Sequence, residues 1–217
     1  MSSDPAYDAI TRARNQENGG NPVGAAQTLE SYLAGDPHNI TARLELARIY
    51  SYALKNRDQG YFQLQVILDL DPDNIAALKA SVTLKANEKW RRHEADEEYT
   101  RLIGLMEDAP KAEYAAVCAA YAVFLRKQMG QYYKSAEYYE KAIEAEPNRY
   151  EFHQDYAVLL LNELRDYVKA KHELEEVLRI KPNHIAAKQN LDRLMRMKFD
   201  SDGNLKQGFF SSLRKRK

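Results

Sequence analysis

Histidine is the residue that most often binds metals and transfers protons in active sites, and the chain has five of them. They stand far apart in sequence, at His38, His93, His153, His172 and His184. None belongs to an HxxxH or HExxH pattern, the spacing that places two ligands on one face of a helix. The histidines therefore predict neither a metal site nor catalysis.

The other reactive side chains point the same way. Cys118 is the single cysteine, lies in the apolar stretch 115–125 and has no basic neighbour in sequence, so we expect a buried structural thiol. The phosphate-binding and nucleophile motifs GxxxxGKS/T, GxGxxG and GxSxG do not occur. The acidic run from Glu94 to Glu98 is typical of a solvated helix face. The sequence thus predicts a protein that is not an enzyme and binds no cofactor.

Composition and charge exclude further classes. Lys and Arg together number 32, and so do Asp and Glu, so no overall field attracts nucleic acid or an anionic membrane. The first residues lack the apolar core of a secretory signal, and no apolar run approaches the roughly 18 residues of a membrane span. A single cysteine fits a reducing compartment. These features predict a cytosolic, cytoplasmic protein.

The remaining possibility is that the protein binds another molecule. A sequence repeat positions the residues that could do so. The sequence of residues 121–148 recurs in similar form at 156–183, which is 35 residues later, and the two stretches align without a gap. Five prolines mark the same period: Pro37, Pro72, Pro110, Pro147 and Pro182, with spacings of 35, 38, 37 and 35. Because proline cannot continue a helix, each is expected to end one repeat.

Three positions recur before each of these prolines, twelve, eight and five residues upstream. Spacings of four and three place them on one face of a helix, and the first of the three is small in four of the five repeats, which predicts a close helix crossing there. The sets are Ala25, Leu29, Tyr32; Gly60, Leu64, Ile67; Glu98, Leu102, Leu105; Ser135, Tyr139, Ala142; and Ala170, Leu174, Val177. After the prolines, Asn39, Asn74, Asn148 and Asn183 are expected to cap the next helix.

The predicted fold class is all-α, with about five helix–turn–helix repeats and a C-terminal capping helix. The expected bounds are 4–37, 39–72, 74–110, 113–147 and 149–182, then a capping helix at 184–198, so that one domain covers 4–198 and a flexible basic tail covers 199–217. Ile185, Leu191, Leu194 and Met195 form the apolar side of the capping helix. The third repeat is irregular, and its three extra residues are expected near the turn between its two helices.

This pattern resembles the tetratricopeptide repeat, a helix–turn–helix unit of about 34 residues. The resemblance extends over positions 6 to 198. It is best in the repeat that ends at Pro147, where the family's pattern is matched by Gly130, Tyr132, Ser135, Tyr139, Ala142 and Pro147. It implies a right-handed α-solenoid that acts as a non-enzymatic scaffold or adaptor and binds a peptide or helical segment of a partner protein in a concave groove. The groove would be built by the first helix of each repeat.

Placing the repeats in register gives the expected groove residues. They are Tyr7, Ile10, Arg14, Leu44, Arg48, Ser51, Lys79, Thr83, Ala119, Val123, Arg126, Gln154, Val158 and Leu161. Because the set mixes apolar and cationic side chains, one hypothesis is a ligand with carboxylates that flank an apolar anchor. The alternative is that these cations are solvated or pair with carboxylates on neighbouring helices.

The C-terminal tail supports a second function. Its aromatic and basic residues could bring the protein to anionic membrane headgroups or to a ribonucleoprotein, as a peripheral adaptor. These residues are Phe209, Phe210, Leu213, Arg214, Lys215, Arg216 and Lys217. At about 1 kcal/mol per basic residue near an anionic surface, the attachment would be weak and reversible. The other reading is a disordered, solubilising tail.

Fifteen tyrosines raise the question of base stacking on nucleic acid. Tyr132, Tyr139, Tyr156 and Tyr167 fall at packing positions of the repeat, so a core role is the better explanation for them. Nucleic-acid binding is therefore not expected, except weakly through the tail.

Overall fold

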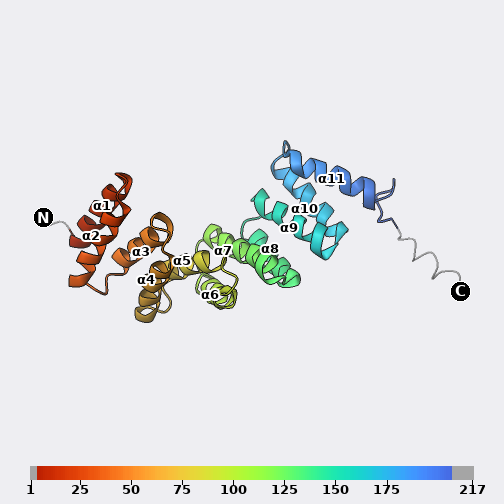
Figure 1. Cartoon of the computed structure of the whole chain (residues 1–217). Helices are drawn as coiled ribbons and strands as arrows, with labels where there is room; N and C mark the ends of the chain where they lie inside the picture. Colours follow the sequence, from red (N-terminus) through yellow and green to blue (C-terminus); the bar gives the residue numbers. More distant parts are fainter. Residues whose placement is uncertain (1–3, 207–217) are drawn as a thin grey trace. The chain divides into compact units, whose positions relative to one another are not determined.

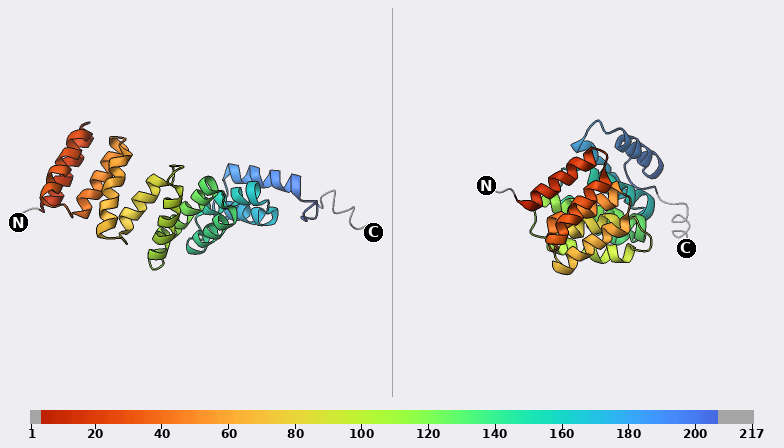
Figure 2. Two further views of the ribbon diagram at one scale, coloured as in Figure 1. Left: turned by 60° about the horizontal axis from the view of Figure 1, so that its bottom comes forward. Right: turned by 60° about the vertical axis from the view of Figure 1, so that its left-hand side comes forward.

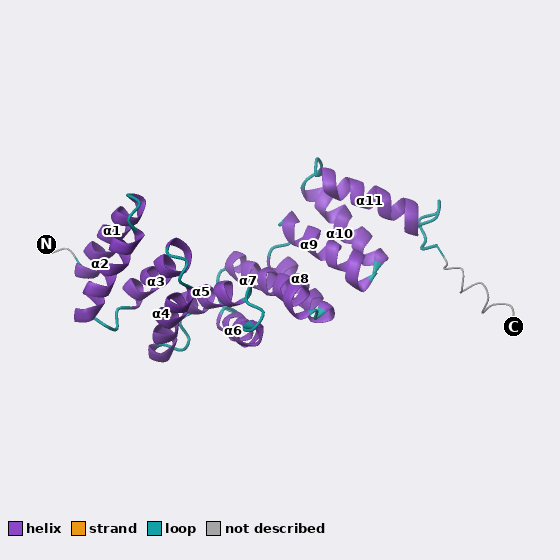
Figure 3. Ribbon diagram, in the orientation of Figure 1, coloured by secondary structure: helices purple, strands orange, loops and turns teal. Residues whose placement is uncertain are grey.

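The computed structural model describes residues 4–206, and most of them are helical (Figure 1, Figure 3). The all-α prediction is confirmed: within that range no β-strand forms, and only an isolated bridge joins Phe199 to Leu205. The helices are α1 Pro5–Asn18, α2 Pro22–Gly35, α3 Ile40–Arg48, α4 Arg57–Leu70, α5 Ile75–Lys85, α6 Arg92–Leu105, α7 Lys111–Phe124, α8 Tyr132–Ala145, α9 Tyr150–Leu159, α10 Tyr167–Ile180 and α11 Ile185–Lys198. One π-helical turn continues each of α3, α7 and α9.

The chain divides into two compact units, an N-terminal unit that ends at Leu105 and a C-terminal unit that begins at Met106. The N-terminal unit contains α1 to α6 and the C-terminal unit α7 to α11, and within each the helices pair in chain order (Figure 2). Ala and Leu side chains of α1, α2 and α3 form one buried cluster, and a second joins α3, α4 and α5. In the C-terminal unit, one cluster runs from α7 to α11.

Helix starts and ends follow the sequence signals in most places. All seven prolines lie at helix boundaries, with Pro5 and Pro22 as the first residues of α1 and α2. Asn39 and Asn74 accept hydrogen bonds from backbone N–H groups of α3 and α5, as expected for caps. Asn148 and Asn183 do not, and that prediction is wrong. The N-cap residue lies two positions after the proline. Asn148 and Asn183 follow their prolines directly, so the next residue, Arg149 or His184, occupies the N-cap position.

Because only some of these asparagines cap a helix, replacing two of them with alanine should change helix stability by different amounts. Asn74→Ala removes the 3.0 Å bond from the Ala77 N–H to Oδ1 and is expected to destabilise α5 by about 1 kcal/mol. Asn148→Ala, before α9, is the matched control and is expected to stay within about 0.5 kcal/mol of the parent protein. Hydrogen exchange of the helix that follows each asparagine measures both, and equal protection losses would contradict the assignment.

The turn between the two helices of a pair uses a left-handed residue two positions before the second helix. Gly20 and Gly130 fill this place in two pairs, and Lys55 and Arg165 adopt positive φ in two others. The equivalent residue before α6 is Trp90, which is not in the left-handed region and is exposed. The third turn is therefore built differently, although the first residues of α5 and α6 have the same spacing in sequence as those of α3 and α4.

The extra residues of the third repeat lie after α6 and not in its turn, which corrects the prediction. The helix α6 ends at Leu105, five residues before Pro110, whereas the other second helices end two residues before their proline. Pro110 instead starts α7. Counting back from Pro110 therefore misplaced Glu98 and Leu105, and the buried residues of α6 are Ala95, Tyr99, Leu102 and Ile103.

With this register, the close-crossing position is small and buried in all five pairs. It lies three residues after the start of each second helix and holds Ala25, Gly60, Ala95, Ser135 and Ala170. A Cβ on Gly60 would meet the Ser51 Oγ at 2.0 Å and the Ala47 carbonyl oxygen at 3.3 Å. The hydroxyl of Ser135 donates to the Ala122 carbonyl oxygen at 2.7 Å. Helix pairs thus pack backbone to backbone at this position.

The tyrosines expected in the core divide between core and surface. Tyr139 and Tyr156 are buried, and Tyr167 is half-buried against the same cluster. Tyr132 is exposed, because it is the first residue of α8 and precedes the buried stripe of that helix.

The end of the described chain also departs from expectation. Leu194 of α11 is buried, but Ile185 is 72% exposed, because the stripe through Ala187 and Leu194 leaves it on another side of the helix. Phe199 is buried in the core cluster, and the Lys206 N–H donates to the Lys198 carbonyl oxygen, so residues 199–206 form a folded turn and not a free tail. All of the expected tail-contact residues, Phe209, Phe210, Leu213, Arg214, Lys215, Arg216 and Lys217, lie outside the described residues.

Candidate partner-binding face

The expected groove residues share a register that can be counted back from each second helix. Leu44, Arg48 and Ser51 lie thirteen, nine and six positions before the first residue of α4. The same count gives Lys79 and Thr83 before α6, Ala119, Val123 and Arg126 before α8, and Gln154, Val158 and Leu161 before α10. We call this set, with Tyr52 and its equivalents one position further on, the first-helix face.

In α1 the expected residues are out of register by two or three positions. The count from α2 gives Ala9, Ala13 and Gln16 in place of Tyr7, Ile10 and Arg14. The first helix carries Thr11 and Arg12 where α3 carries the large–small pair Leu46 and Ala47, so the sequence offered no anchor there. As a result, Ile10 is buried in the core of the N-terminal unit.

Burial divides the remaining predicted residues. Ser51 and Ala119 are buried and cannot present a side chain to a partner. The half-buried residues are Leu44, Arg48, Lys79, Val123, Arg126, Gln154, Val158 and Leu161, and Tyr7, Arg14 and Thr83 are exposed. The first-helix face is therefore a partly apolar surface, and most of its side chains are half-buried, with part of each accessible to a partner.

A hollow opens in the N-terminal unit between α3 with its π turn and α5. It has a volume of about 100 Å³, its walls include Leu44, Ala47 and Leu84, and Arg48 and Tyr52 stand beside them. Tyr52 is 50% exposed. The walls are mostly aliphatic, so the hollow suits an apolar side chain.

The C-terminal unit has a hollow at the equivalent place, between the π turn of α9 and α11. Leu161, Asn162, Asn190 and Leu194 line it, and its volume is about 200 Å³. These four residues correspond in order to Ser51, Tyr52, Ala80 and Leu84 of the first hollow, with the same sequence separation in all four cases. The hollow between successive first helices thus recurs in both units.

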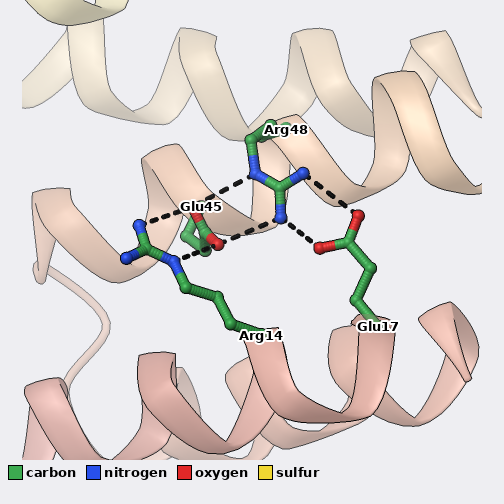
Figure 4. A network of polar contacts seen from close by, with 4 residues as sticks. All are labelled: Arg14, Glu17, Glu45 and Arg48. Carbon is green, nitrogen blue, oxygen red and sulfur yellow. Dashed lines mark hydrogen bonds and ion pairs between the residues drawn. The ribbon is translucent and has the colours of Figure 1, made fainter. Parts of the chain in front are cut away.

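Two of the predicted groove cations, Arg14 and Arg48, belong to an ion-pair network between α1 and α3 (Figure 4). Glu45 accepts from Arg14 Nε at 2.8 Å and from Arg48 Nη2 at 3.0 Å, and Arg48 Nη1 also donates to Glu17 at 3.1 Å. The Glu45 side chain is only 8% exposed. Burial pushes the pKa of Glu45 up, but the hydrogen bonds from both guanidinium groups outweigh it and hold the pKa below its ordinary value.

A third cation is paired in the same way. Arg126 Nε lies 3.1 Å from Glu163 Oε1, between the π turns that continue α7 and α9. Arg14, Arg48 and Arg126 are thus neutralised by carboxylates of the chain itself, which is the alternative that the sequence left open. Their charge is not free to select an acidic ligand.

Two histidines and the cysteine have structural roles. Nδ1 of His153 in α9 lies 2.7 Å from Glu173 Oε2 in α10, and Nε2 lies 2.9 Å from the carbonyl oxygen of Pro147, which precedes α9. His184 caps α11, and burial raises the pKa of the Cys118 thiol, as expected for a structural cysteine. Within residues 4–206, no three His, Cys, Asp or Glu side chains gather in a way that could hold a metal ion.

Sequence reasoning missed the His153–Glu173 pair, although a signal for it existed. His153 stands fourteen positions before the first residue of α10, and Glu173 stands six positions after it. At the same two places around α4 stand Arg43 and Gln63, which are joined by a 2.6 Å hydrogen bond. Paired polar residues at these positions indicate a buried polar contact between the two helices of a repeat.

The family comparisons agree with this architecture. Two stretches match models described as tetratricopeptide repeat, residues 19–82 and residues 115–149. The comparison with curated proteins gave no match. No helix among residues 4–206 combines the length and apolarity needed to cross a bilayer.

Several solved structures share the fold at low sequence identity. MamA from Desulfovibrio magneticus, from residue 41 to its end, is 15% identical with a TM-score of 0.68, over 85% of this chain and 99% of that one. PilF of Pseudomonas aeruginosa is 20% identical with a TM-score of 0.66, over 88% and 83%. A tetratricopeptide repeat protein from Parabacteroides merdae is 15% identical with a TM-score of 0.69, over 89% and 73%. The repeat matches and the paired-helix fold together identify the chain as a tetratricopeptide-repeat protein.

Proposed function

We propose that this chain is a non-enzymatic scaffold or adaptor, and that it binds a peptide or a helical segment of a partner protein on the first-helix face. Tetratricopeptide repeats generally mediate protein–protein interactions and are typically not catalytic. The observation that carries the proposal is the recurrence of the hollow between successive first helices, at equivalent residues of both units. Each unit thus offers a bound segment a place to insert a side chain.

Both hollows offer apolar contacts to a bound side chain, although Asn162, Asn190, Arg193 and Lys198 also line the C-terminal one. Leu44, Ala47 and Leu84 in one, and Leu161, Leu194 and Met197 in the other, are hydrophobic contacts for an aliphatic or aromatic side chain. A ligand carboxylate would have to compete with Glu45 for Arg14 and Arg48. The proposed ligand is therefore a segment with apolar anchors, in which acidic residues are not required.

The location of the protein belongs to the same proposal. Cys118 is buried and unpaired, and the fold uses no disulfide bond within the described residues. A cytoplasmic location is consistent with both observations.

Affinity capture with surface variants tests the binding face. Tyr52→Ala with Thr83→Arg alters the N-terminal hollow and its surroundings, and Asn162→Arg with Met197→Arg alters the C-terminal one. All four residues are exposed, so the fold should be kept. We expect at least one protein to be captured tenfold less by one of these pairs. The control pair, Val23→Arg with Tyr133→Ala, changes exposed residues at the second position of α2 and α8. Loss of capture by this pair alone would contradict the proposed face.

A further inference from the structure

The third helix pair lacks a large side chain that the neighbouring pairs bury. Eleven residues before the second helix stand Leu46, Tyr121 and Tyr156 in the second, fourth and fifth pairs, and all three are buried. The third pair has Ser81 at this place. A hydroxymethyl group thus replaces an isobutyl group or a phenol ring between α5 and the preceding helix α4.

A hollow of about 300 Å³ lies at this place, within the N-terminal unit. It is lined by Tyr61, Phe62 and Gln65 of α4, by Ser81 and Lys85 of α5, and by Arg91. We call it the Ser81 hollow. An apolar cavity of about 150 Å³ accepts a benzene ring, so a phenol ring has enough room here.

Two charged side chains in the wall of the hollow, Lys85 and Arg91, are held by partners in the chain. Lys85 occupies the position of Tyr50, Leu125 and Leu160, and its ammonium group binds Glu98 at 2.7 Å and Glu94 at 3.1 Å on α6. The guanidinium group of Arg91 lies 4.2 Å from the centre of the Tyr61 ring. Because both cations are held by partners in the chain, neither is free to fold into the hollow and fill it.

The equivalent site in the C-terminal unit shows what such a place accommodates. There the Tyr156 hydroxyl donates to Glu140 Oε1 at 2.6 Å. Glu140 is eight residues after the start of α8, and Gln65 is eight residues after the start of α4. An acceptor for a phenol hydroxyl is therefore retained in the Ser81 hollow, although the chain supplies no phenol there.

We propose that the Ser81 hollow binds a tyrosine side chain of a partner protein. The ring would pack against Tyr61 and Phe62, which provide aromatic surface, and the hydroxyl would donate to Gln65. Phenylalanine could make the same ring contacts but would lack the hydrogen bond to Gln65. Anionic side chains are disfavoured, because Asp58 lies in the wall and Glu94 and Glu98 already neutralise Lys85.

This site is separate from the first-helix face. The Ser81 hollow and the hollow beside Tyr52 share no lining residue. Substitutions in one therefore leave the lining of the other unchanged, and the two proposals can fail independently.

The test uses p-cresol, the side-chain analogue of tyrosine, and toluene, that of phenylalanine. Each is titrated into the full chain, and backbone amide NMR signals are followed. We expect p-cresol to cause saturable shifts at residues 58–65 and 81–91, with a dissociation constant at least threefold lower than that of toluene. Gln65→Leu should abolish this preference.

The decisive variants fill the Ser81 hollow with a larger side chain at position 81. Ser81→Tyr copies Tyr156 and should weaken p-cresol binding at least tenfold. Ser81→Leu, which copies Leu46, is a second filled variant should the tyrosine disturb folding. Thr83→Tyr adds the same ring at an exposed position of α5 and should bind p-cresol like the parent chain. Unsaturable shifts, equal binding of toluene, or undiminished binding in a folded Ser81 variant would each overturn the proposal.

Discussion

Replacing Tyr139 with alanine is expected to lower the free energy of unfolding of the C-terminal unit by about 3–5 kcal/mol. The side chain is fully buried, at 0% exposure, and belongs to the core cluster of that unit. Its ring stacks on Tyr156 with 5.7 Å between ring centroids, so the substitution removes both packing area and an aromatic contact. Leu29, Leu64 and Leu174 occupy the same place in other pairs, which makes the position a general anchor between helices.

Tyr133→Ala is the matched control, because it makes the same change on the same helix at a residue that is 79% exposed. It is expected to stay within about 0.5 kcal/mol of the parent chain. Urea unfolding followed by amide NMR signals of α8 and α9 measures both variants. Trp90, the single tryptophan, lies in the N-terminal unit, so its fluorescence provides an internal reference. Equal losses for Tyr139→Ala and Tyr133→Ala would mean that the assigned register is wrong.

The second large effect concerns His153 and pH. Both ring nitrogens face acceptors, the Glu173 carboxylate and the Pro147 carbonyl oxygen, so the geometry favours the doubly protonated imidazolium. Burial acts to lower the pKa of His153, but the hydrogen bonds to Glu173 and Pro147 outweigh it, and the pKa is raised. The folded state therefore holds its proton at a pH at which the unfolded chain has lost it.

The sign of the pH dependence follows from this shift. The stabilisation is fully present below the unfolded pKa, about 6.5, and is lost as pH rises through the higher folded value. The contribution of His153 to the free energy of unfolding of the C-terminal unit should thus decrease from about pH 6 toward pH 8 and above. Urea unfolding at several pH values, read from amides of α9 and α10, measures it.

His153→Leu is expected to remove this slope and to cost about 3–5 kcal/mol near neutral pH, because it leaves the Glu173 carboxylate, whose side chain is 8% exposed, without its cation. His172→Leu, at an exposed position of α10, is the control and should change stability by no more than about 0.5 kcal/mol. An unchanged pH slope in His153→Leu would refute the assignment of the proton to this residue.

The fold was predictable because its signals are local. Proline, capping residues and small residues at a fixed spacing mark where helices end and where they cross, and the comparison of 121–148 with 156–183 supplied the register. The helix register was predicted wrongly where the proline lies at a different distance from the helix before it. Pro110 is the N-cap residue of α7 and lies five residues after α6 instead of two, so counting back from it misplaced Glu98 and Leu105.

The details of the candidate face were less predictable, because they depend on contacts between distant residues. Arg14 and Glu45 are 31 residues apart, and nothing in their sequence neighbourhoods distinguishes a paired guanidinium group from a free one. The Ser81 hollow was hidden for a related reason. It lies where a small residue, Ser81, replaces a large one, and the register of that position becomes visible only once the start of α6 is known.

Photo-cross-linking of a captured partner tests most directly whether the first-helix face is the binding surface. The photoreactive amino acid p-benzoylphenylalanine is placed at Tyr52 or at Asn162, which are equivalent positions of the two units, and at Tyr133 or Val23 on second helices as controls. Binding on the first-helix face predicts an adduct from position 52 or 162 and none from 133 or 23. An adduct from 133 or 23 alone would show that the partner binds elsewhere.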